Sequence, residues 1–286
     1  MSRISSARSR RSLLSAGGAL LAGVTVLATQ AAGSVSAAPS QEHRHHGSEP
    51  KPTVVLVHGA FADASSWNGV IKQLKREGYP VIAPANPLRG LGSDADYLAG
   101  VLKTVKGPIV LAGHSYGGSV ISEAAEGNQN VKALVYVAAF IPEKGESALE
   151  LTNKFPGSTL PPTTSPSQYP LPGGGTGTEL TIKQDKFRAQ FAADVPAQTA
   201  ELMAVTQRPV AVSALEERAT RVAWKAIPSY ALVTTEDKNI PAAALRFMAE
   251  RAHAGTVETR ASHAVTVSRP QTVSDLITRA AKATSH

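Results

Sequence analysis

From Thr53 onward, short apolar runs alternate with segments of helical periodicity. Trp67, Val70, Ile71 and Leu74 show that periodicity, because they recur at intervals of three or four residues. The apolar runs are TVVLV (53–57), PVIAPA (80–85), PIVLAG (108–113), KALVYVAAF (132–140), YALVTT (230–235) and TVETR (256–260). Strands that alternate with helices form βαβ units, in which helices cover both faces of a parallel sheet. The sequence therefore predicts an α/β domain over 53–286 with a mostly parallel central sheet.

One long segment, residues 141–224, interrupts this alternation. Within it, residues 156–178 contain six prolines and five glycines, a composition that predicts neither a regular helix nor a strand. Residues 185–219 have a helical pattern instead. We interpret the whole segment as an inserted lid, partly loop and partly helix, over the carboxyl edge of the sheet. The alternative for 156–178 is a disordered insertion without a role.

The first residues are typical of an export signal. Four arginines and no acidic residue lie within 1–12, and a weakly apolar run follows over 13–27. Small residues before Ala37 predict cleavage after that residue, which leaves 38–52 as a flexible leader. The run SRRSLL resembles a twin-arginine signal, with the general export route as the alternative. An uncleaved membrane anchor is the competing interpretation, although the apolar run is short for a spanning helix. We expect a secreted protein without stable membrane association.

Composition excludes several classes of chemistry. The chain has no cysteine, so it has no disulfide, no thiolate nucleophile and no cysteine-ligated metal. Its formal net charge of +7 is largely due to the export signal. Without residues 1–37, 25 basic and 22 acidic residues remain, and a net charge of +3 favours no nucleic-acid partner. We expect catalysis by serine, histidine and carboxylate groups, with no metal and no cofactor.

The sequence GHSYGG, residues 113–118, follows an expected strand and precedes a helical segment. It matches the pattern G-x-S-x-G, in which a serine on a sharp strand-to-helix turn exposes its hydroxyl above the sheet edge. Gly113 and Gly117 leave room for the strand and the helix to pass close together. Ser115 is therefore the predicted nucleophile.

A serine hydroxyl needs a general base, which in this arrangement follows the nucleophile in the chain. His253, His263 and His286 meet that condition. His286 is the last residue, and His253 ends an apparently helical run, as a surface histidine would. His263 lies in a loop between an expected strand and the final helix, and we predict that it is the base.

The third group holds the imidazole in its tautomer and should follow another strand. The apolar run 230–235 ends directly at Glu236 and Asp237. We favour Asp237, because it leads into the loop KNIP past the strand end, and keep Glu236 as the alternative. Two backbone N–H groups must also stabilise the developing oxyanion. We assign them to Ala60 and Tyr116, with Phe61 as the alternative to Ala60.

The segments VVLVHGAFADASSW, GHSYGG, TTEDKNIP and SHAVTVSRP together resemble the α/β-hydrolase superfamily. More narrowly, they are similar to small bacterial esterases related to plant methyl-ester esterases and hydroxynitrile lyases. The resemblance implies an α/β-hydrolase fold, with Ser115, Asp237 and His263 as the catalytic triad. It also implies Ala60 and Tyr116 as the oxyanion donors.

The same resemblance helps to separate two reactions. Lyases of this branch have Thr and Lys at the positions of Gly59 and Ala264, which favours ester hydrolysis here. We expect a secreted serine carboxylesterase that cleaves small to medium carboxylic esters through an acyl-enzyme. A carbon–carbon lyase and an amide or lactone hydrolase are the alternatives. Expected substrate contacts are Phe61, His114 and Phe140.

Overall fold

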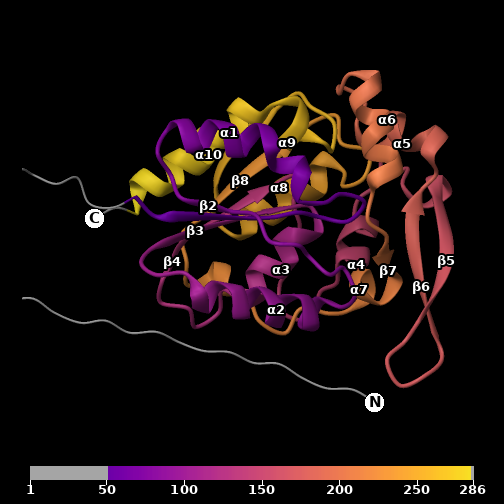
Figure 1. The fold of residues 1–286 in the computed structure, drawn as a ribbon, viewed down its shortest axis with the longest axis horizontal. Helices are drawn as coiled ribbons and strands as arrows, with labels where there is room; N and C mark the ends of the chain where they lie inside the picture. The colour runs from indigo at the N-terminus through magenta and orange to yellow at the C-terminus, as the bar shows by residue number, and fades with distance from the viewer. Residues whose placement is uncertain (1–50, 285–286) are drawn as a thin grey trace, which may run out of the picture. The chain divides into compact units, whose positions relative to one another are not determined.

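The computed structural model describes residues 51–284, and a six-stranded sheet forms its centre (Figure 1). In chain order the strands of this sheet are β1 (Thr53–Val57), β2 (Val81–Ile82), β3 (Ile109–His114), β4 (Val131–Val137), β8 (Ser229–Thr234) and β9 (Gly255–Thr259). They lie side by side in the order β2-β1-β3-β4-β8-β9, and every neighbouring pair is parallel. The predicted α/β fold with a parallel central sheet is confirmed. The second expected strand is the shortest, because only two of its residues pair with β1.

Helices cover both faces of the sheet, as Figure 1 shows. Helices α1 (Asn68–Arg76) and α10 (Pro270–Ala283) pack together on one face. Helices α2 (Leu91–Thr104), α3 (Tyr116–Ala124) and α8 (Ala242–Arg251) contribute to the core on the other face. Both faces of each central strand are thus buried, which explains why the strands read as continuous apolar runs.

The apolar stripe expected on α1 is buried. Val70 and Leu74 are fully buried against Val273 and Ile277 of α10. Burial of each such side chain stabilises the fold by about 1.5–3 kcal/mol. The helix ends where Gly78 takes φ +77°, a left-handed conformation that glycine adopts without a Cβ clash.

The insertion between β4 and β8 has its own secondary structure. Its elements are α4 (Ala148–Asn153), the 3₁₀ turn η2 (Pro161–Thr163), β5 (Thr164–Pro170), β6 (Thr176–Ile182), α5 (Gln184–Phe191), α6 (Ala197–Thr206), β7 (Val210–Ala211), α7 (Val212–Glu216) and the 3₁₀ turn η3 (Ala223–Lys225). Figure 1 shows α5, α6 and the strands β5 and β6 beyond one end of the central strands. The helices predicted over 185–219 are confirmed for most of the segment. The prediction missed strand β7, which pairs with β6.

The prediction that residues 156–178 form no strand is wrong. Strands β5 and β6 pair along seven residues as an antiparallel hairpin. Prolines are tolerated because β5 is an edge strand of the sheet β5-β6-β7, where an N–H need not join a ladder. The glycines form the turn: Gly173, Gly174 and Gly175 all have positive φ, between +83° and +103°. Proline and glycine thus mark an edge and a turn here, not an irregular loop.

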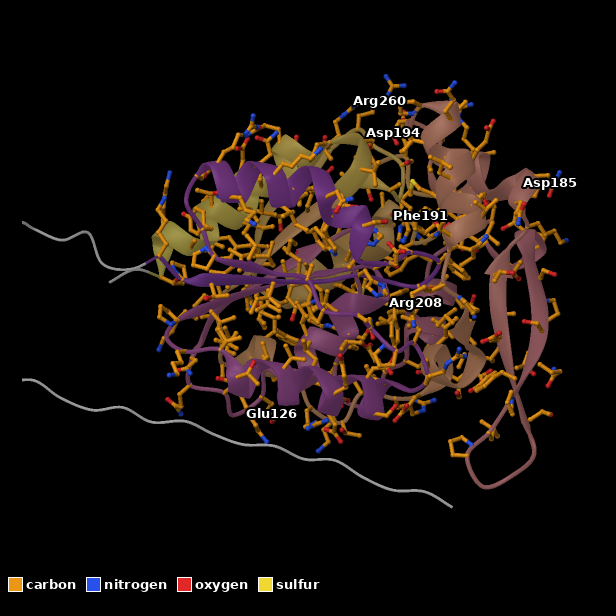
Figure 2. All side chains as sticks on the ribbon, viewed as in Figure 1. Glu126, Asp185, Phe191, Asp194, Arg208 and Arg260 are labelled. Atoms are coloured by element: carbon orange, nitrogen blue, oxygen red, sulfur yellow. The ribbon has the colours of Figure 1, made fainter. Side chains whose placement is uncertain are left out.

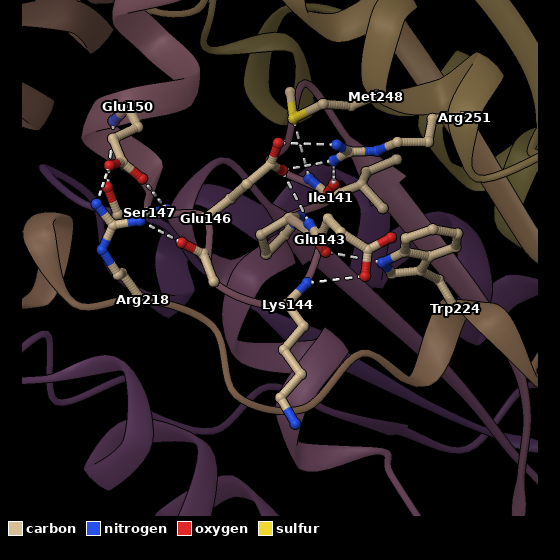
Figure 3. A network of polar contacts seen from close by, with 12 residues as sticks. Ile141, Glu143, Lys144, Glu146, Ser147, Glu150, Arg218, Trp224, Met248 and Arg251 are labelled. Atoms are coloured by element: carbon tan, nitrogen blue, oxygen red, sulfur yellow. Dashed lines mark hydrogen bonds and ion pairs between the residues drawn. The ribbon is translucent and has the colours of Figure 1, made fainter.

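A polar network closes the base of the insertion (Figure 3). Arg251 of α8 donates to both carboxylate oxygens of Glu146, at 2.7 and 2.9 Å, and to the carbonyl of Ile141 at 2.9 Å. From the far end of the insertion, Trp224 Nε1 donates to the Pro142 carbonyl at 2.8 Å. Arg218 pairs with Glu150, a residue of the capping box that begins α4. The start and the end of the insertion are therefore held at one place.

The predicted export signal over 1–37 and the leader up to residue 50 lie outside the described residues, as does His286. Over residues 51–284, no helix combines the length and the hydropathy that crossing a membrane would require.

Candidate active site

Ser115 occupies a strained turn between β3 and α3. Its φ of +53° and ψ of −124° lie outside the regions that L-residues commonly adopt. The turn requires glycines around it, because a Cβ on Gly113 would lie 2.5 Å from the Gly117 carbonyl oxygen. A Cβ on Gly117 would lie 2.6 Å from the carbonyl oxygen of Val57 in β1. The sequence therefore folds locally so that the serine hydroxyl projects from the end of a buried strand.

The structure brings Ser115, His263 and Asp237 into one hydrogen-bonded line. His263 Nε2 lies 2.8 Å from Ser115 Oγ, and His263 Nδ1 lies 2.7 Å from Asp237 Oδ2. An ionised carboxylate only accepts, so Nδ1 carries the proton and Nε2 is free to accept from the serine hydroxyl. His263 is 1% exposed and follows β9, while Asp237 follows β8, so both come from loops at the carboxyl ends of strands. This is the geometry of an activated serine nucleophile.

Asp237 is held in place by its own loop. Its Oδ1 accepts from the backbone N–H groups of Asn239 and Ile240 at 2.8 and 2.9 Å. Its Oδ2 also accepts from the Thr234 hydroxyl at 2.9 Å. The alternative acid, Glu236, faces away and pairs with Arg260 at the surface. The structure therefore places Asp237, and not Glu236, beside the imidazole.

The other histidine alternatives are not part of this line. His253 lies just past α8 with φ +49° and is exposed, as its position at the end of a helical run predicts. His114 directly precedes Ser115, but its side chain contacts His263 and is not part of the triad.

The two residues expected to supply the oxyanion donors lie beside the nucleophile. Ala60 and Tyr116 line a cavity together with Ser115. Within residues 51–284, neither N–H group donates to another part of the chain. The alternative donor, the N–H of Phe61, is already bonded to the Arg208 carbonyl at 3.2 Å. Ala60 and Tyr116 are thus the two donors that remain available.

A buried carboxylate that sequence reasoning missed anchors Tyr116. The Tyr116 hydroxyl donates to Asp94 Oδ2 at 2.9 Å, and the Arg89 N–H donates to the same carboxyl group at 3.2 Å. Burial raises the pKa of the Asp94 carboxyl, and it also raises the pKa of Tyr116 well above its ordinary value. No local motif marks Asp94, which is 22 residues away in the sequence and meets Tyr116 only when α2 packs on α3.

His114 does not line the cavity, which corrects its expected role as a substrate contact. It is 1% exposed, and its Nε2 donates to the backbone carbonyl of His263 at 2.9 Å. The centroid of its ring lies 4.8 Å from that of the His263 ring. Phe191 of the insertion, which is labelled in Figure 2, packs edge-on against both rings. His114 and Phe191 thus fix the orientation of His263 from two sides. Trp67 is buried in the core behind His114, as its helical position predicts.

The burial of His114 gives a testable dependence of stability on pH. Burial, and then the nearby His263, lower the pKa of His114 to about 3. In the unfolded chain its pKa is near 6.5, so between these values the unfolded state binds a proton that the folded state does not. The His114 contribution to the free energy of unfolding therefore falls by about 1.4 kcal/mol per pH unit below pH 6.5, or about 2 kcal/mol by pH 5.

Urea unfolding at pH 7 and pH 5 tests this dependence. Relative to the wild type, His114→Gln should lose less stability between the two pH values. Gln retains a donor for the His263 carbonyl but cannot titrate in this range. An equal loss in both proteins would contradict the assignment of a neutral, buried His114.

The cavity at Ser115 has a volume of about 170 Å³ and is mostly apolar. Phe61 and Phe140 line it, in agreement with their expected position. Most of the remaining wall comes from the insertion, which supplies Ala148, Leu149, Thr152, Asn153, Ser158, Leu160, Pro161, Thr164, Leu180 and Leu215. Among residues 51–284, none of those that line the cavity has a charged side chain. Over residues 51–284, no group of three His, Asp or Glu side chains is arranged to hold a metal ion.

The comparisons agree with this architecture. The model of the "Alpha/beta hydrolase family" matches residues 54–276. A carbendazim hydrolyzing esterase from Nocardioides sp. (strain SG-4G) is 32% identical over 126 residues, which cover 39% of this chain and half of that relative. The structure of polyneuridine aldehyde esterase has a TM-score of 0.70 at 20% identity and covers 80% of this chain and 98% of its own. An extracellular alpha/beta-hydrolase from Paenibacillus species has a TM-score of 0.63 at 23% identity, with coverages of 80% and 98%.

Proposed function

The chain belongs to the alpha/beta hydrolase family, and from that premise we propose that it is a secreted serine carboxylesterase acting on small to medium carboxylic esters. The observation that carries the proposal is the line from Ser115 Oγ through His263 to Asp237, with contacts of 2.8 and 2.7 Å. The carbendazim hydrolyzing esterase among its relatives supports an esterase activity.

The geometry supports an acyl-enzyme mechanism. Ser115 Oγ attacks the ester carbonyl while His263 Nε2 accepts its proton, and Asp237 stabilises the imidazolium. The N–H groups of Ala60 and Tyr116 donate to the oxyanion of the tetrahedral intermediate. When the intermediate collapses, the bond to the alcohol breaks, and His263 gives the proton to the leaving oxygen. Water then repeats these steps on the acyl-enzyme and releases the acid.

The lining of the cavity supports an uncharged substrate. The cavity offers the apolar surfaces of Leu149, Leu160, Leu180, Leu215 and Phe140. None of the described residues that line it has a charged side chain to pair with an ionised acyl group. A volume of about 170 Å³ suits a short or medium acyl chain. Amide and lactone hydrolysis on the same triad remain alternatives within this mechanism.

The lyase alternative is disfavoured by the space around Gly59. A Cβ there would lie 2.6 Å from Ser115 Cβ and 2.7 Å from the His114 carbonyl oxygen. The Thr that the resembling lyases carry at this position has no room on this backbone. Ala264, at the position of their Lys, is buried, and its N–H is bonded to the carbonyl of Phe191.

Export is part of the proposal. The arginine-rich start, the apolar run 13–27 and the cleavage site after Ala37 support it. The structural neighbour from Paenibacillus species, described as extracellular, is consistent with such a location for enzymes of this fold.

Labelling combined with two activity assays tests the reaction. We expect the purified protein to hydrolyse p-nitrophenyl acetate and butyrate, and a fluorophosphonate to form a stoichiometric adduct on Ser115, seen by peptide mass spectrometry. We expect no release of cyanide from mandelonitrile. Release of cyanide without ester hydrolysis would favour the lyase instead, and an adduct on another serine would contradict the assignment of Ser115.

A further inference from the structure

A second and larger cavity lies behind the loop that carries Ala60. Its volume is about 340 Å³, twice that of the cavity at Ser115. Its walls come from three parts of the chain that are distant in sequence. They are the segment after β1 with Phe61 and Ser66, helix α6 of the insertion with Leu202 and Met203, and helix α9 (Val265–Ser268) with Val267.

Phe61 is the wall between the two cavities. It lines both, and no other described residue does so. The side chain is 3% exposed, and the backbone has φ +59°, which is unusual for a residue with a bulky side chain. The N–H group of Phe61 donates to the carbonyl of Arg208. Arg208, labelled in Figure 2, lies in the chain between α6 and β7. The insertion thus fixes the strained backbone that holds this aromatic ring in position.

The chemistry of ester cleavage indicates which part of a substrate would meet the second cavity. The leaving oxygen must lie near His263 Nε2, which supplies its proton, so the alcohol part extends on the side of His263. Helix α9 begins two residues after His263 and supplies Val267 to the second cavity. The cavity at Ser115 lies instead against Phe140, α4 and the hairpin. The second cavity is therefore on the alcohol side.

The lining indicates what the second cavity can hold. Phe61, Leu202, Met203 and Val267 present apolar surface, and hydroxyl and amide groups lie among them. The carboxylate of Asp63 also lines this cavity, and it accepts from the N–H and the hydroxyl of Ser65. Leu202 is 67% exposed, so the apolar surface continues to the outside of α6. Because Asp63 is already bonded to Ser65, the remaining surface, which is mostly apolar, suits a bulky, cyclic or branched alcohol without a charge.

We propose that Phe61 is the specificity-determining residue on the alcohol side: it closes the second cavity from Ser115, so that the alcohol part of a bulky ester cannot enter that cavity. This inference rests on the proposed esterase function. With Phe61 in place, the enzyme prefers small alcohols. A smaller side chain joins the two cavities and extends the accepted alcohol.

Two series of esters test the proposal, each followed by pH-stat titration. The alcohol series is ethyl, cyclohexyl and menthyl acetate, and the acyl series is ethyl acetate, hexanoate and decanoate. In Phe61→Ala, the kcat/KM ratio of menthyl to ethyl acetate should rise by about 10-fold or more, a size of effect typical of a pocket that gains apolar volume. The ratios in the acyl series should stay within about 2-fold of the wild type.

Two further variants separate this effect from general loosening. In the Phe61→Ala background, Met203→Trp should fill the second cavity and cancel the gain for menthyl acetate. Phe247→Ala removes the same side-chain volume at another position, where the ring packs on Phe155 away from both cavities. It should leave the kcat/KM ratios of both ester series unchanged.

A gain in the acyl series, or a gain that Met203→Trp does not cancel, would overturn the proposal. Ethyl acetate hydrolysis and fluorophosphonate labelling of Ser115 in the same preparations show independently whether the proposed esterase function stands.

Discussion

Replacement of Ser115 by Ala is expected to lower kcat/KM for p-nitrophenyl acetate by roughly 10⁴- to 10⁶-fold, the range found when a serine nucleophile is removed. Without Oγ no acyl-enzyme can form, and His263 Nε2 loses its 2.8 Å partner. The residual rate would come from the oxyanion donors acting on a bound water. The fold should persist, because Ala is compatible with a site that already demands small residues around it.

Rates of hydrolysis and the pre-steady-state burst of p-nitrophenol measure this effect. Ser119→Ala is the matched control, since Ser119 is a buried serine one turn further along α3. Its hydroxyl has no hydrogen-bond partner within residues 51–284, so its removal should leave the rate within about 2-fold. If Ser115→Ala kept more than a few per cent of the wild-type rate, Ser115 would not be the nucleophile.

Asp237→Asn is expected to lower kcat by about 10⁴-fold with little change in KM, as in other Ser-His-Asp triads. The reason lies in the hydrogen bonds of its loop. The N–H groups of Asn239 and Ile240 require an acceptor at the Oδ1 position, so the amide NH₂ must face His263. This NH₂ group would donate to His263 Nδ1, so the imidazole proton would move to Nε2. A protonated Nε2 can no longer accept the proton of the Ser115 hydroxyl.

Steady-state kinetics of Asp237→Asn and Glu236→Gln distinguish the two adjacent acids. Glu236 contacts only Arg260 among the side chains described, so Glu236→Gln should retain activity within about 2-fold. Equal losses in the two variants would show that the loop tolerates no change at all, and a larger loss in Glu236→Gln would reverse the assignment.

The triad could be predicted from the sequence because each member follows a strand. The runs before Ser115 and Asp237 are buried strands, and the run before His263 is a largely exposed edge strand. All three belong to one parallel sheet, and their carboxyl ends meet at one edge. The elbow is also a local signal, since steric crowding demands glycine at Gly113 and Gly117. The triad could therefore be predicted mainly from polar residues that directly follow an expected strand.

The parts that sequence reasoning missed depend on long-range packing. Asp94 supports Tyr116, and Phe191 orients His263, but each meets its partner only after helices assemble. His114 was expected in the pocket because it adjoins Ser115, yet the elbow turns adjacent side chains in different directions. The hairpin over 164–182 was missed because proline and glycine were interpreted by composition, without regard to their placement at an edge and a turn.

The closed base of the insertion has a consequence for how this enzyme could acquire new substrates. Ile141 and Trp224 lie at opposite ends of the insertion, and both are tied to the same small region by Arg251 and the Pro142 carbonyl. The segment between them can thus be exchanged between these two attachment points, provided that a ring equivalent to Phe191 keeps its contact with His263. Its replacement would change most of the wall around Ser115 without cutting a strand that carries the triad. Substrate range and catalytic chemistry are therefore encoded in largely separate parts of one chain, which meet where Phe191 contacts His263.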